Sequence, residues 1–281
     1  MNYCENIQKS IDYIEDNIKE DIDINRVVQQ SGYSTTHFYR IFQALMGEAI
    51  KEYIIKRKLS NAAIELAVTK KRLIEIAIDY GFNSQEVFTR AFTKLFHITP
   101  GRYRKIKSSI VLYEKINAYQ KLMDHIGDVL IPKIVLEKEF KIVGMKKTVK
   151  PGSASIRSLW DDFSTRKCEI ANTMTKEDIL GICEYMPDIT DESEFEYLAG
   201  VEVADFTHIP EGMITKTIPL SKYAVFTHKG KMSELKATYE NIYGRWLPLS
   251  GIKLAEADTI EIYSLKNNQE STLDIYIPLQ L

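Results

Sequence analysis

Two short stretches near the N-terminus place polar side chains at the spacing of an exposed helix face. In the major groove of DNA, arginine can bind guanine, glutamine can bind adenine, and glutamate can accept a hydrogen bond from cytosine. Taken singly, each such side chain is equally well explained as a solvated surface group. The candidate DNA-binding residues are Ser34, Thr35, Thr36, Tyr39, Arg40, Ser84, Gln85, Glu86, Thr89 and Arg90.

A second candidate site lies in the C-terminal half and consists of aromatic residues near one acid. In the run Thr259–Tyr263, strand alternation puts Glu261 and Tyr263 on the same face. A carboxylate among aromatic rings suits a flat organic cation, through ion-pair and cation–π contacts. Spacing alone favours the plainer alternative, in which Glu261 faces water and Trp160 and Trp246 belong to the core.

The elements that must position the first set occur twice in the sequence. The motif Phe-x-Arg-x-Phe is found at Phe38–Phe42 and again, 50 residues later, at Phe88–Phe92. Each copy follows a short helix pattern that ends in glycine, a residue that accepts the left-handed conformation, and a serine that can cap the next helix. The sequence therefore predicts two helix-turn-helix units.

A long helix is predicted to join the two units. Apolar residues recur at helical spacing from about Ala49 to Lys70. Such a helix is roughly 30 Å long, which would let the two units enter successive major grooves about 34 Å apart. A plain helical bundle is the alternative.

After about residue 110 the pattern changes. Residues 110–124 could form a linking helix, and beyond Pro132 short alternating stretches are separated by two helical ones, about 153–174 and 231–246. The order strand, helix, strand, strand occurs twice, which predicts an α+β domain with one curved antiparallel sheet. The expected organisation is an all-α DNA-binding domain over 1–107, a linker over 108–134 and a small-molecule-binding domain over 135–281.

Charge is distributed unevenly along the 281 residues. The net charge of −2 argues against a nucleic-acid partner for the whole chain. However, residues 22–107 contain 15 Lys and Arg against 7 Asp and Glu, whereas residues 108–281 contain 20 against 26. A basic block joined to an acidic one is typical of a nucleic-acid-binding module fused to another domain.

Several classes of protein are not expected. The sequence has no apolar run long enough for a membrane span and no secretory signal, and three scattered cysteines suit a reducing cytoplasm. No Cys and His spacing is that of a zinc site, and no phosphate-binding loop or nucleophile–base pair is found. We therefore expect no cofactor, no metal and no enzymatic activity.

The N-terminal motifs closely resemble those of the AraC/XylS regulators. The resemblance covers residues 5–107 and includes Ser31–Ser34, Phe38–Phe42, Ile76–Phe82, Phe88–Phe92 and Thr99-Pro100. It implies a seven-helix domain that binds an asymmetric site on double-stranded DNA. His97 stands where the family usually has glycine. Because histidine tolerates the left-handed conformation better than most residues, we expect only a local adjustment there.

The C-terminal motifs look like those of the GyrI-like (gyrase-inhibitor-like) effector-binding domain. They are Tyr223–Gly230, Tyr239–Pro248, Glu261–Tyr263 and Leu273–Leu279. The resemblance implies a duplicated fold that takes small molecules, including cationic lipophilic drugs, at a glutamate like Glu261. The effector-binding candidates are Glu261, Tyr263, Trp246, Trp160 and Tyr223.

The combined prediction is a cytoplasmic, sequence-specific transcription regulator that responds to a small effector. Activation, with RNA polymerase as a partner, is expected from the resemblance rather than from the residues. Two alternatives stay open for the C-terminal domain. It could hydrolyse small molecules with Glu261 as a general base, or it could be a protein-interaction module.

Overall fold

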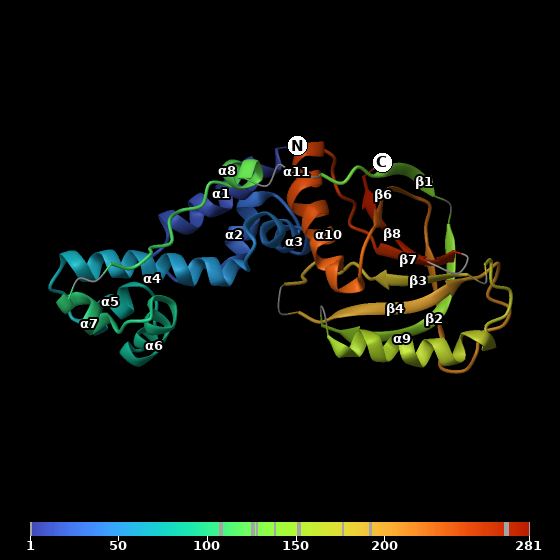
Figure 1. The fold of residues 1–281 in the computed structure, drawn as a ribbon, viewed down its shortest axis with the longest axis horizontal. Helices are drawn as coiled ribbons and strands as arrows, with labels where there is room; N and C mark the ends of the chain where they lie inside the picture. Colours follow the sequence, from blue (N-terminus) through green and yellow to red (C-terminus); the bar gives the residue numbers. More distant parts are fainter. Residues whose placement is uncertain are drawn as a thin grey trace. The chain divides into compact units, whose positions relative to one another are not determined.

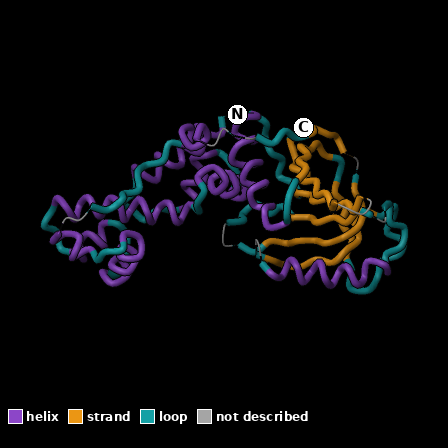
Figure 2. Tube along the Cα trace, viewed as in Figure 1, coloured by secondary structure: helices purple, strands orange, loops and turns teal. Residues whose placement is uncertain are grey.

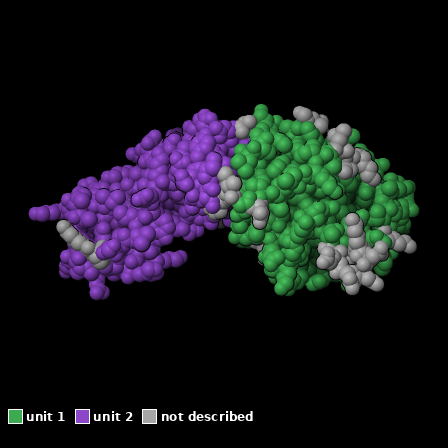
Figure 3. All heavy atoms as spheres, turned by 45° about the horizontal axis from the view of Figure 1, so that its top comes forward, with its two compact units in different colours: residues 1, 127–281 green, residues 2–126 purple. Residues whose placement is uncertain are grey.

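The chain forms two compact units, Asn2–Ile126 and Gly127–Leu281 together with Met1 (Figure 3). The computed structural model describes residues 2–106, 109–124, 127, 129–137, 139–150, 153–175, 177–190, 193–266 and 270–280. Each unit is described by itself. Within these described ranges, no helix is both long and apolar enough to cross a bilayer.

In the first unit, the regular elements among the described residues are all helices (Figure 2). Its apolar stripe at Ile7, Ile11 and Ile14 is fully buried, as expected for an amphipathic helix. The helices are α1 (Tyr3–Asp16), α2 (Ile24–Ser31), α3 (Thr35–Met46), α4 (Ile50–Val68), α5 (Leu73–Asp79), α6 (Gln85–Phe96), α7 (Pro100–Ile106) and α8 (Ala118–Asp124).

The turns of both helix-turn-helix units have the predicted chemistry. Gly32 has φ 68° and Gly81 has φ 75°, so both use the left-handed region. Ser34 caps α3 by accepting from the His37 amide at 3.5 Å, and Ser84 caps α6 by accepting from the Val87 amide at 3.2 Å. His97 adopts φ 58° and ends α6 in place of glycine, which confirms the expected local adjustment.

Residues 109–124 belong to the helical unit (Figure 1). The linking helix predicted over 110–124 is wrong for its first part, because only α8 is helical. The preceding residues are extended, with Ile110 and Leu112 packed inward and Val111 83% exposed between them. An alternation of this kind belongs to an extended chain rather than a helix.

The second unit contains one antiparallel sheet of eight strands in the order β1-β6-β8-β7-β3-β4-β2-β5 (Figure 1). The predicted antiparallel α+β fold is confirmed, and its duplication is visible as the order β1-β2-α9-β3-β4 followed by β5-β6-α10-β7-β8. The sequence did not predict β1 and β5, the two edge strands. The strands are β1 (Lys133–Glu137), β2 (Phe140–Val149), β3 (Asp178–Cys183), β4 (Phe195–Glu202), β5 (Ile214–Ile218), β6 (Ser221–His228), β7 (Thr259–Lys266) and β8 (Glu270–Leu279).

Each repeat contributes one helical segment in addition to its strands. In the first repeat, α9 (Ala154–Arg166) packs on β2 and β4 through Leu159 and Phe163. In the second, α10 (Leu235–Asn241) continues through a π-helical turn, η3 (Ile242–Trp246), into α11 (Leu247–Ser250). At the centre of the sheet, β3 of the first repeat pairs with β7 of the second repeat.

Candidate DNA-contact helices and effector site

The second helix-turn-helix unit presents its predicted polar residues to solvent. On α6, Glu86 and Arg90 are exposed, and Gln85 and Thr89 are half-buried. The Phe88 and Phe92 side chains of the same helix are fully buried in the core of this half. Ser84 and the neighbouring Arg90 charge hold the pKa of the Glu86 carboxyl below its usual value. The polar face of α6 is therefore charged and accessible.

The first recognition helix differs in part from the prediction. Thr35 and Arg40 on α3 are half-buried, but Thr36 is 0% exposed and Tyr39 is 6% exposed. The Tyr39 ring packs edge-on against Phe38 with centroids 5.9 Å apart. In addition, α8 packs against α3, and the sequence had placed α8 in a linker. The predicted exposure of Thr36 and Tyr39 is thus wrong.

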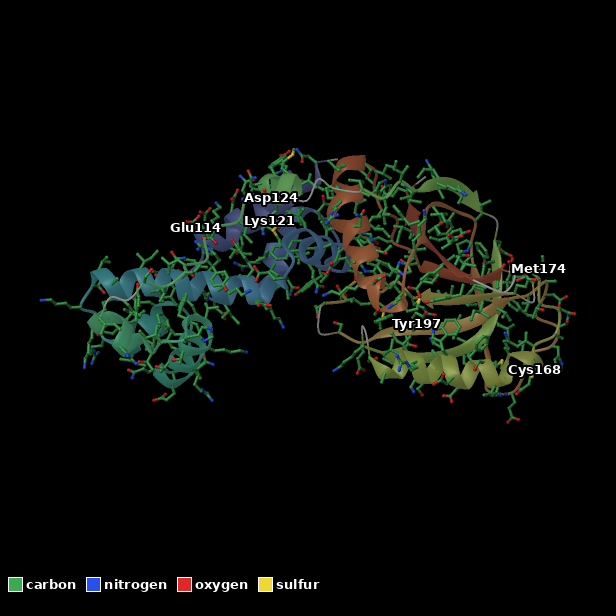
Figure 4. The ribbon with its side chains drawn as sticks, viewed as in Figure 1. Glu114, Lys121, Asp124, Cys168, Met174 and Tyr197 are labelled. Carbon is green, nitrogen blue, oxygen red and sulfur yellow. The ribbon has the colours of Figure 1, made fainter. Side chains whose placement is uncertain are left out.

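The centre of the second unit is a buried carboxylate with three tyrosine donors. Glu261 is 5% exposed. Its Oε2 accepts hydrogen bonds from the hydroxyls of Tyr197 and Tyr263, both at 2.8 Å. Its Oε1 accepts one from the Tyr239 hydroxyl at 2.6 Å. Tyr197 comes from β4 (Figure 4), Tyr263 from β7 and Tyr239 from α10, so the acid is bound by three separate elements.

Burial and the Glu261 charge act together on these hydroxyls. Burial first, and then the Glu261 carboxylate, raises the pKa of Tyr197, Tyr239 and Tyr263 well above the ordinary tyrosine value. A phenolate next to a carboxylate would suffer both desolvation and like-charge repulsion. The three hydroxyls therefore stay protonated, and they donate to Glu261 throughout the physiological pH range. The alternative in which Glu261 faces water is not found, because its side chain is buried.

A glycine makes room for this arrangement. Gly181 on β3 pairs directly with Glu261 on β7. A Cβ added at Gly181 would lie 2.0 Å from the Tyr197 hydroxyl oxygen and 3.1 Å from Glu261 Oε2. Such a distance to an oxygen is well inside van der Waals contact. The position therefore requires a residue without a side chain, so that the Tyr197 hydroxyl can reach the carboxylate.

Trp160 on α9 is half-buried beside these residues. Its ring meets Tyr263 edge-on at 5.3 Å and Tyr197 edge-on at 6.2 Å between centroids. Both are favourable aromatic geometries. The structure thus brings together three of the effector-binding candidates, Trp160, Tyr263 and Glu261.

Trp246 lies farther from the carboxylate. It is 8% exposed and packs edge-on against Phe226 on β6, with centroids 4.9 Å apart. Phe226 pairs with Ile275, which in turn pairs with Glu261. Trp246 thus contacts a strand that lies two positions from β7, about 10 Å at the usual strand spacing.

Tyr223 was a wrong choice, because it lies on the opposite face of the sheet. Its ring meets that of Tyr276 edge-on at 5.6 Å, and Tyr276 pairs with Ile260. Since consecutive residues of a strand point to opposite faces, Ile260 and Glu261 face away from each other. Tyr223 belongs to the apolar cluster on the Ile260 side and is fully buried there.

Tyr197 and Tyr239 contact Glu261 but were not predicted as site residues from the sequence. Tyr239 was part of the motif Tyr239–Pro248, but nothing in the spacing linked it to Glu261, which is 22 positions away. Tyr197 lies in the first repeat, 64 positions from Glu261. The alternation of β4 alone could have placed Tyr197 on an inward face, but the pairing of β3 with both β4 and β7 brings it to the acid.

One contact ties the helix above the site to the start of the unit. Asn241, the last residue of α10, is 9% exposed, and its Oδ1 accepts a hydrogen bond from the Leu130 amide at 3.0 Å. Tyr239, two positions earlier on α10, donates to Glu261. The short helix α10 therefore carries both Tyr239, which donates a hydrogen bond to Glu261, and Asn241, which holds the segment at Leu130.

Among the residues that the structure describes, no group of three or more His, Cys, Asp or Glu side chains could hold a metal ion. The three tyrosine hydroxyls donate to the Glu261 carboxylate itself. The chemistry of this site is that of charge and aromatic surface.

Comparison with known proteins assigns both units. A model of the GyrI-like small molecule binding domain matches residues 132–280, more than half of the chain. A helix-turn-helix domain model matches residues 27–106. Both predicted resemblances are thereby confirmed.

Three curated relatives are similar to this chain over different lengths. The chain is 45% identical over 104 residues to the HTH-type transcriptional regulator YbfP of Bacillus subtilis, covering 37% of this chain and 35% of YbfP. It is 32% identical over 183 residues to the transcriptional regulator BrlR of Pseudomonas aeruginosa, covering 60% and 66%. It is 26% identical over 268 residues to the right origin-binding protein of Escherichia coli K12, covering 89% and 87%.

The chain thus spans about a third of YbfP and just under two thirds of BrlR. With the right origin-binding protein the similarity extends over both units. The GyrI-like model matches residues 132–280, and the helix-turn-helix model matches the helical domain before them. The chain belongs to the family of the GyrI-like small-molecule-binding domain, here joined to a helix-turn-helix domain of the AraC type.

Proposed function

We propose that the protein is a DNA-binding transcription regulator whose C-terminal unit binds a small effector at Glu261. The observation that carries the proposal is the buried carboxylate with three tyrosine donors next to Trp160. It occurs in a domain whose family binds small molecules, on a chain with a helix-turn-helix domain. Two relatives of the chain are named as transcriptional regulators, which supports the same assignment.

DNA contact is assigned to the polar faces of α3 and α6. On α6 the proposed residues are those of the sequence analysis, Ser84, Gln85, Glu86, Thr89 and Arg90. On α3 the proposal is limited to Ser34, Thr35 and Arg40, because Thr36 and Tyr39 are buried. Two different recognition helices on one chain suit an asymmetric site in double-stranded DNA. We further propose activation through RNA polymerase, in the cytoplasm.

The proposed effector is a flat organic cation. Glu261 supplies a negative charge, and Trp160 and Tyr263 supply aromatic surface beside it, the combination that binds cationic aromatic molecules. A cation that reaches the carboxylate would compete with the tyrosine hydroxyls for its oxygens. Tyr239 is the donor on α10 rather than on the sheet, so its displacement would disturb α10.

Binding without turnover is part of the proposal. Both oxygens of Glu261 already accept hydrogen bonds from tyrosine hydroxyls, whereas a general base must lie within hydrogen-bond reach of the proton that it removes. The relatives are named as regulators. Loss of a small-molecule substrate on incubation with the protein, abolished in Glu261→Gln, would overturn this part alone.

Tryptophan fluorescence tests the effector site directly, because the chain has two tryptophans. We would titrate the full chain with aromatic quaternary cations and with neutral aromatic compounds of similar size. Cations are expected to quench at micromolar concentration in the wild type and in Trp246→Phe, but not in Trp160→Phe or Glu261→Gln. Quenching that persists in Glu261→Gln would contradict the proposed site, and equal quenching by neutral compounds would contradict the proposed cation.

A further inference from the structure

Residues 109–124, which we name the strap, cross the first unit from one helix-turn-helix half to the other. The segment begins beyond α7, at the second half, and ends in α8 at the first half. In Figure 1 it follows α4 and α1 as a green trace, and Figure 4 labels Glu114, Lys121 and Asp124 on it. Its residues contact both halves of the unit and the helix α4 between them.

At its start the strap packs on the core of the second half. Ile110 and Leu112 lie against the buried cluster that contains Phe92 of α6 and Tyr103 of α7. Val111, between them, is 83% exposed. Because Ile110 and Leu112 face the core and Val111 faces away from it, the strap is extended here and uses one face for the contact.

In its middle the strap is held along α4. The Tyr113 amide donates to Ser60 Oγ at 3.0 Å, and the Tyr113 carbonyl accepts from Arg57. Lys56 Nζ lies 5.1 Å from the Tyr113 ring centroid, a cation–π distance. The backbone of Tyr113 thus has both its donor and its acceptor satisfied by α4.

At its end the strap is fixed to the first half. Lys115 forms an ion pair with Asp12 of α1 at 2.7 Å, and the Ala118 amide donates to Gln8 Oε1 of α1 at 2.9 Å. Ala118 is 0% exposed and Leu122 is 5% exposed. The helix that carries them, α8, packs on both α1 and α3.

We infer that the strap is a positioning element for DNA binding, which fixes the spacing and rotation of the two recognition helices. The 19 residues of α4 form the other connection, roughly 28 Å long. A single helix can bend, and the two halves would then rock about it. A second connection that grips both halves and the helix between them restricts that motion. Two linked binding modules gain affinity only when their geometry matches the two sites.

The inference rests on the proposed DNA binding, and the experiment separates the two. The full chain first selects its site from a random pool of double-stranded DNA, and footprinting locates the two contacted grooves. Sites with one, two or three inserted base pairs between those grooves are then compared with the selected site. Failure to select any DNA would remove the proposed function and this inference with it.

The variant that releases the strap is Ile110→Ser with Leu112→Ser, and its matched control is Val111→Ser. Wild type and Val111→Ser are expected to bind the selected site much more tightly than the lengthened sites. The double variant is expected to bind the selected site about tenfold more weakly, and its preference over the lengthened sites should fall towards one. A loss of core packing alone would lower stability without changing the spacing preference.

A second variant guards against loss of the fold. Lys115→Ala with Gln8→Ala removes polar anchors at the first half and leaves both apolar cores unchanged. It should show the same fall in spacing preference, with hydrogen exchange of residues 109–116 increased. If these amides exchange faster while the wild-type spacing preference is kept, the strap does not position the recognition helices and the inference is overturned.

Discussion

At the residue scale, Gly181 determines whether Tyr197 can reach Glu261. In Gly181→Ala the new methyl group would collide with the Tyr197 hydroxyl, 2.0 Å away. The ring must move, and overpacking of this kind costs about 1–3 kcal/mol. We expect weaker quenching by aromatic cations and a lower unfolding midpoint of the C-terminal unit.

The control for that change is Gly127→Ala, because a Cβ at Gly127 would meet no atom within 4 Å. It should leave both the quenching and the midpoint as in the wild type. Wild-type cation affinity in Gly181→Ala would mean that the Tyr197 hydrogen bond is not needed for the site.

Glu65 on α4 predicts how the helical unit responds to acid. Hydrogen bonds from Lys19 and then Lys71 lower the pKa of the Glu65 carboxyl to about 2, and the Tyr80 hydroxyl donates to it at 3.1 Å. The unfolded value is about 4.3. Because the folded pKa is the lower one, the stabilisation is complete above about pH 4.3 and is lost as the pH falls towards 2.

Glu65→Gln should therefore destabilise α4 and α5 by about 1–2 kcal/mol at neutral pH, after allowance for solvent screening, and much less near pH 2. Hydrogen exchange measures these helices separately from the C-terminal unit. Glu114→Gln, at an exposed position of the strap, is the control. An equal destabilisation by Glu65→Gln at both pH values would contradict the assigned ion pairs.

At the scale of elements, local chemistry made most of the fold predictable. Glycine and serine at fixed positions around α3 and α6 predicted both turns, because one helix end and the next cap are decided within a few residues. The register of the sheet was not accessible in this way. Tyr223 and Glu261 both occur in short alternating strands, and only the pairing of β6, β8 and β7 shows that they face opposite sides.

The same distinction separates the predicted from the missed site residues. Glu261 and Tyr263 are two positions apart, so the strand period alone places them together. Tyr197 and Tyr239 reach the carboxylate from β4 and α10, through contacts between distant segments. The edge strands β1 and β5 pair with the opposite repeat, a long-range exchange that no local pattern announces.

The recognition helix α6 offers a test of direct base contact. Arg90 and Lys94 are both exposed and lie one turn apart. Arg90→Ala should weaken binding to the selected site by about 1–3 kcal/mol and relax the preference at one base pair, if arginine binds a guanine there. Lys94→Ala should weaken binding to all sequences alike and reduce the salt dependence. Equal effects of both changes on every sequence would assign Arg90 to the phosphate backbone.

At the scale of the whole molecule, the proposed regulation requires that effector binding alters DNA binding, and the chain that joins the units is the route that we would test. A ligand can shift an equilibrium only by its differential affinity for the two states. The C-terminal unit holds the incoming segment at Leu130, through Asn241 on the helix that also supplies Tyr239 to Glu261. Displacement of Tyr239 by a cation would therefore act on α10, the helix that also holds the segment at Leu130. The π-helical turn η3 follows α10 directly, and such turns are often found at functional sites.

Asn241→Ala removes the acceptor for the Leu130 amide and leaves Tyr239 and Glu261 in place. We expect cation quenching to stay within about twofold of the wild type, because the loss of one hydrogen bond outside the site is worth only about 1 kcal/mol. The change that the cation produces in affinity for the selected DNA should shrink markedly, since coupling needs the anchored segment. Glu240→Ala, at an exposed neighbouring position on α10, should keep both properties. If Asn241→Ala preserves the full effect of the cation on DNA affinity, coupling passes through other contacts, and α10 serves the effector site alone.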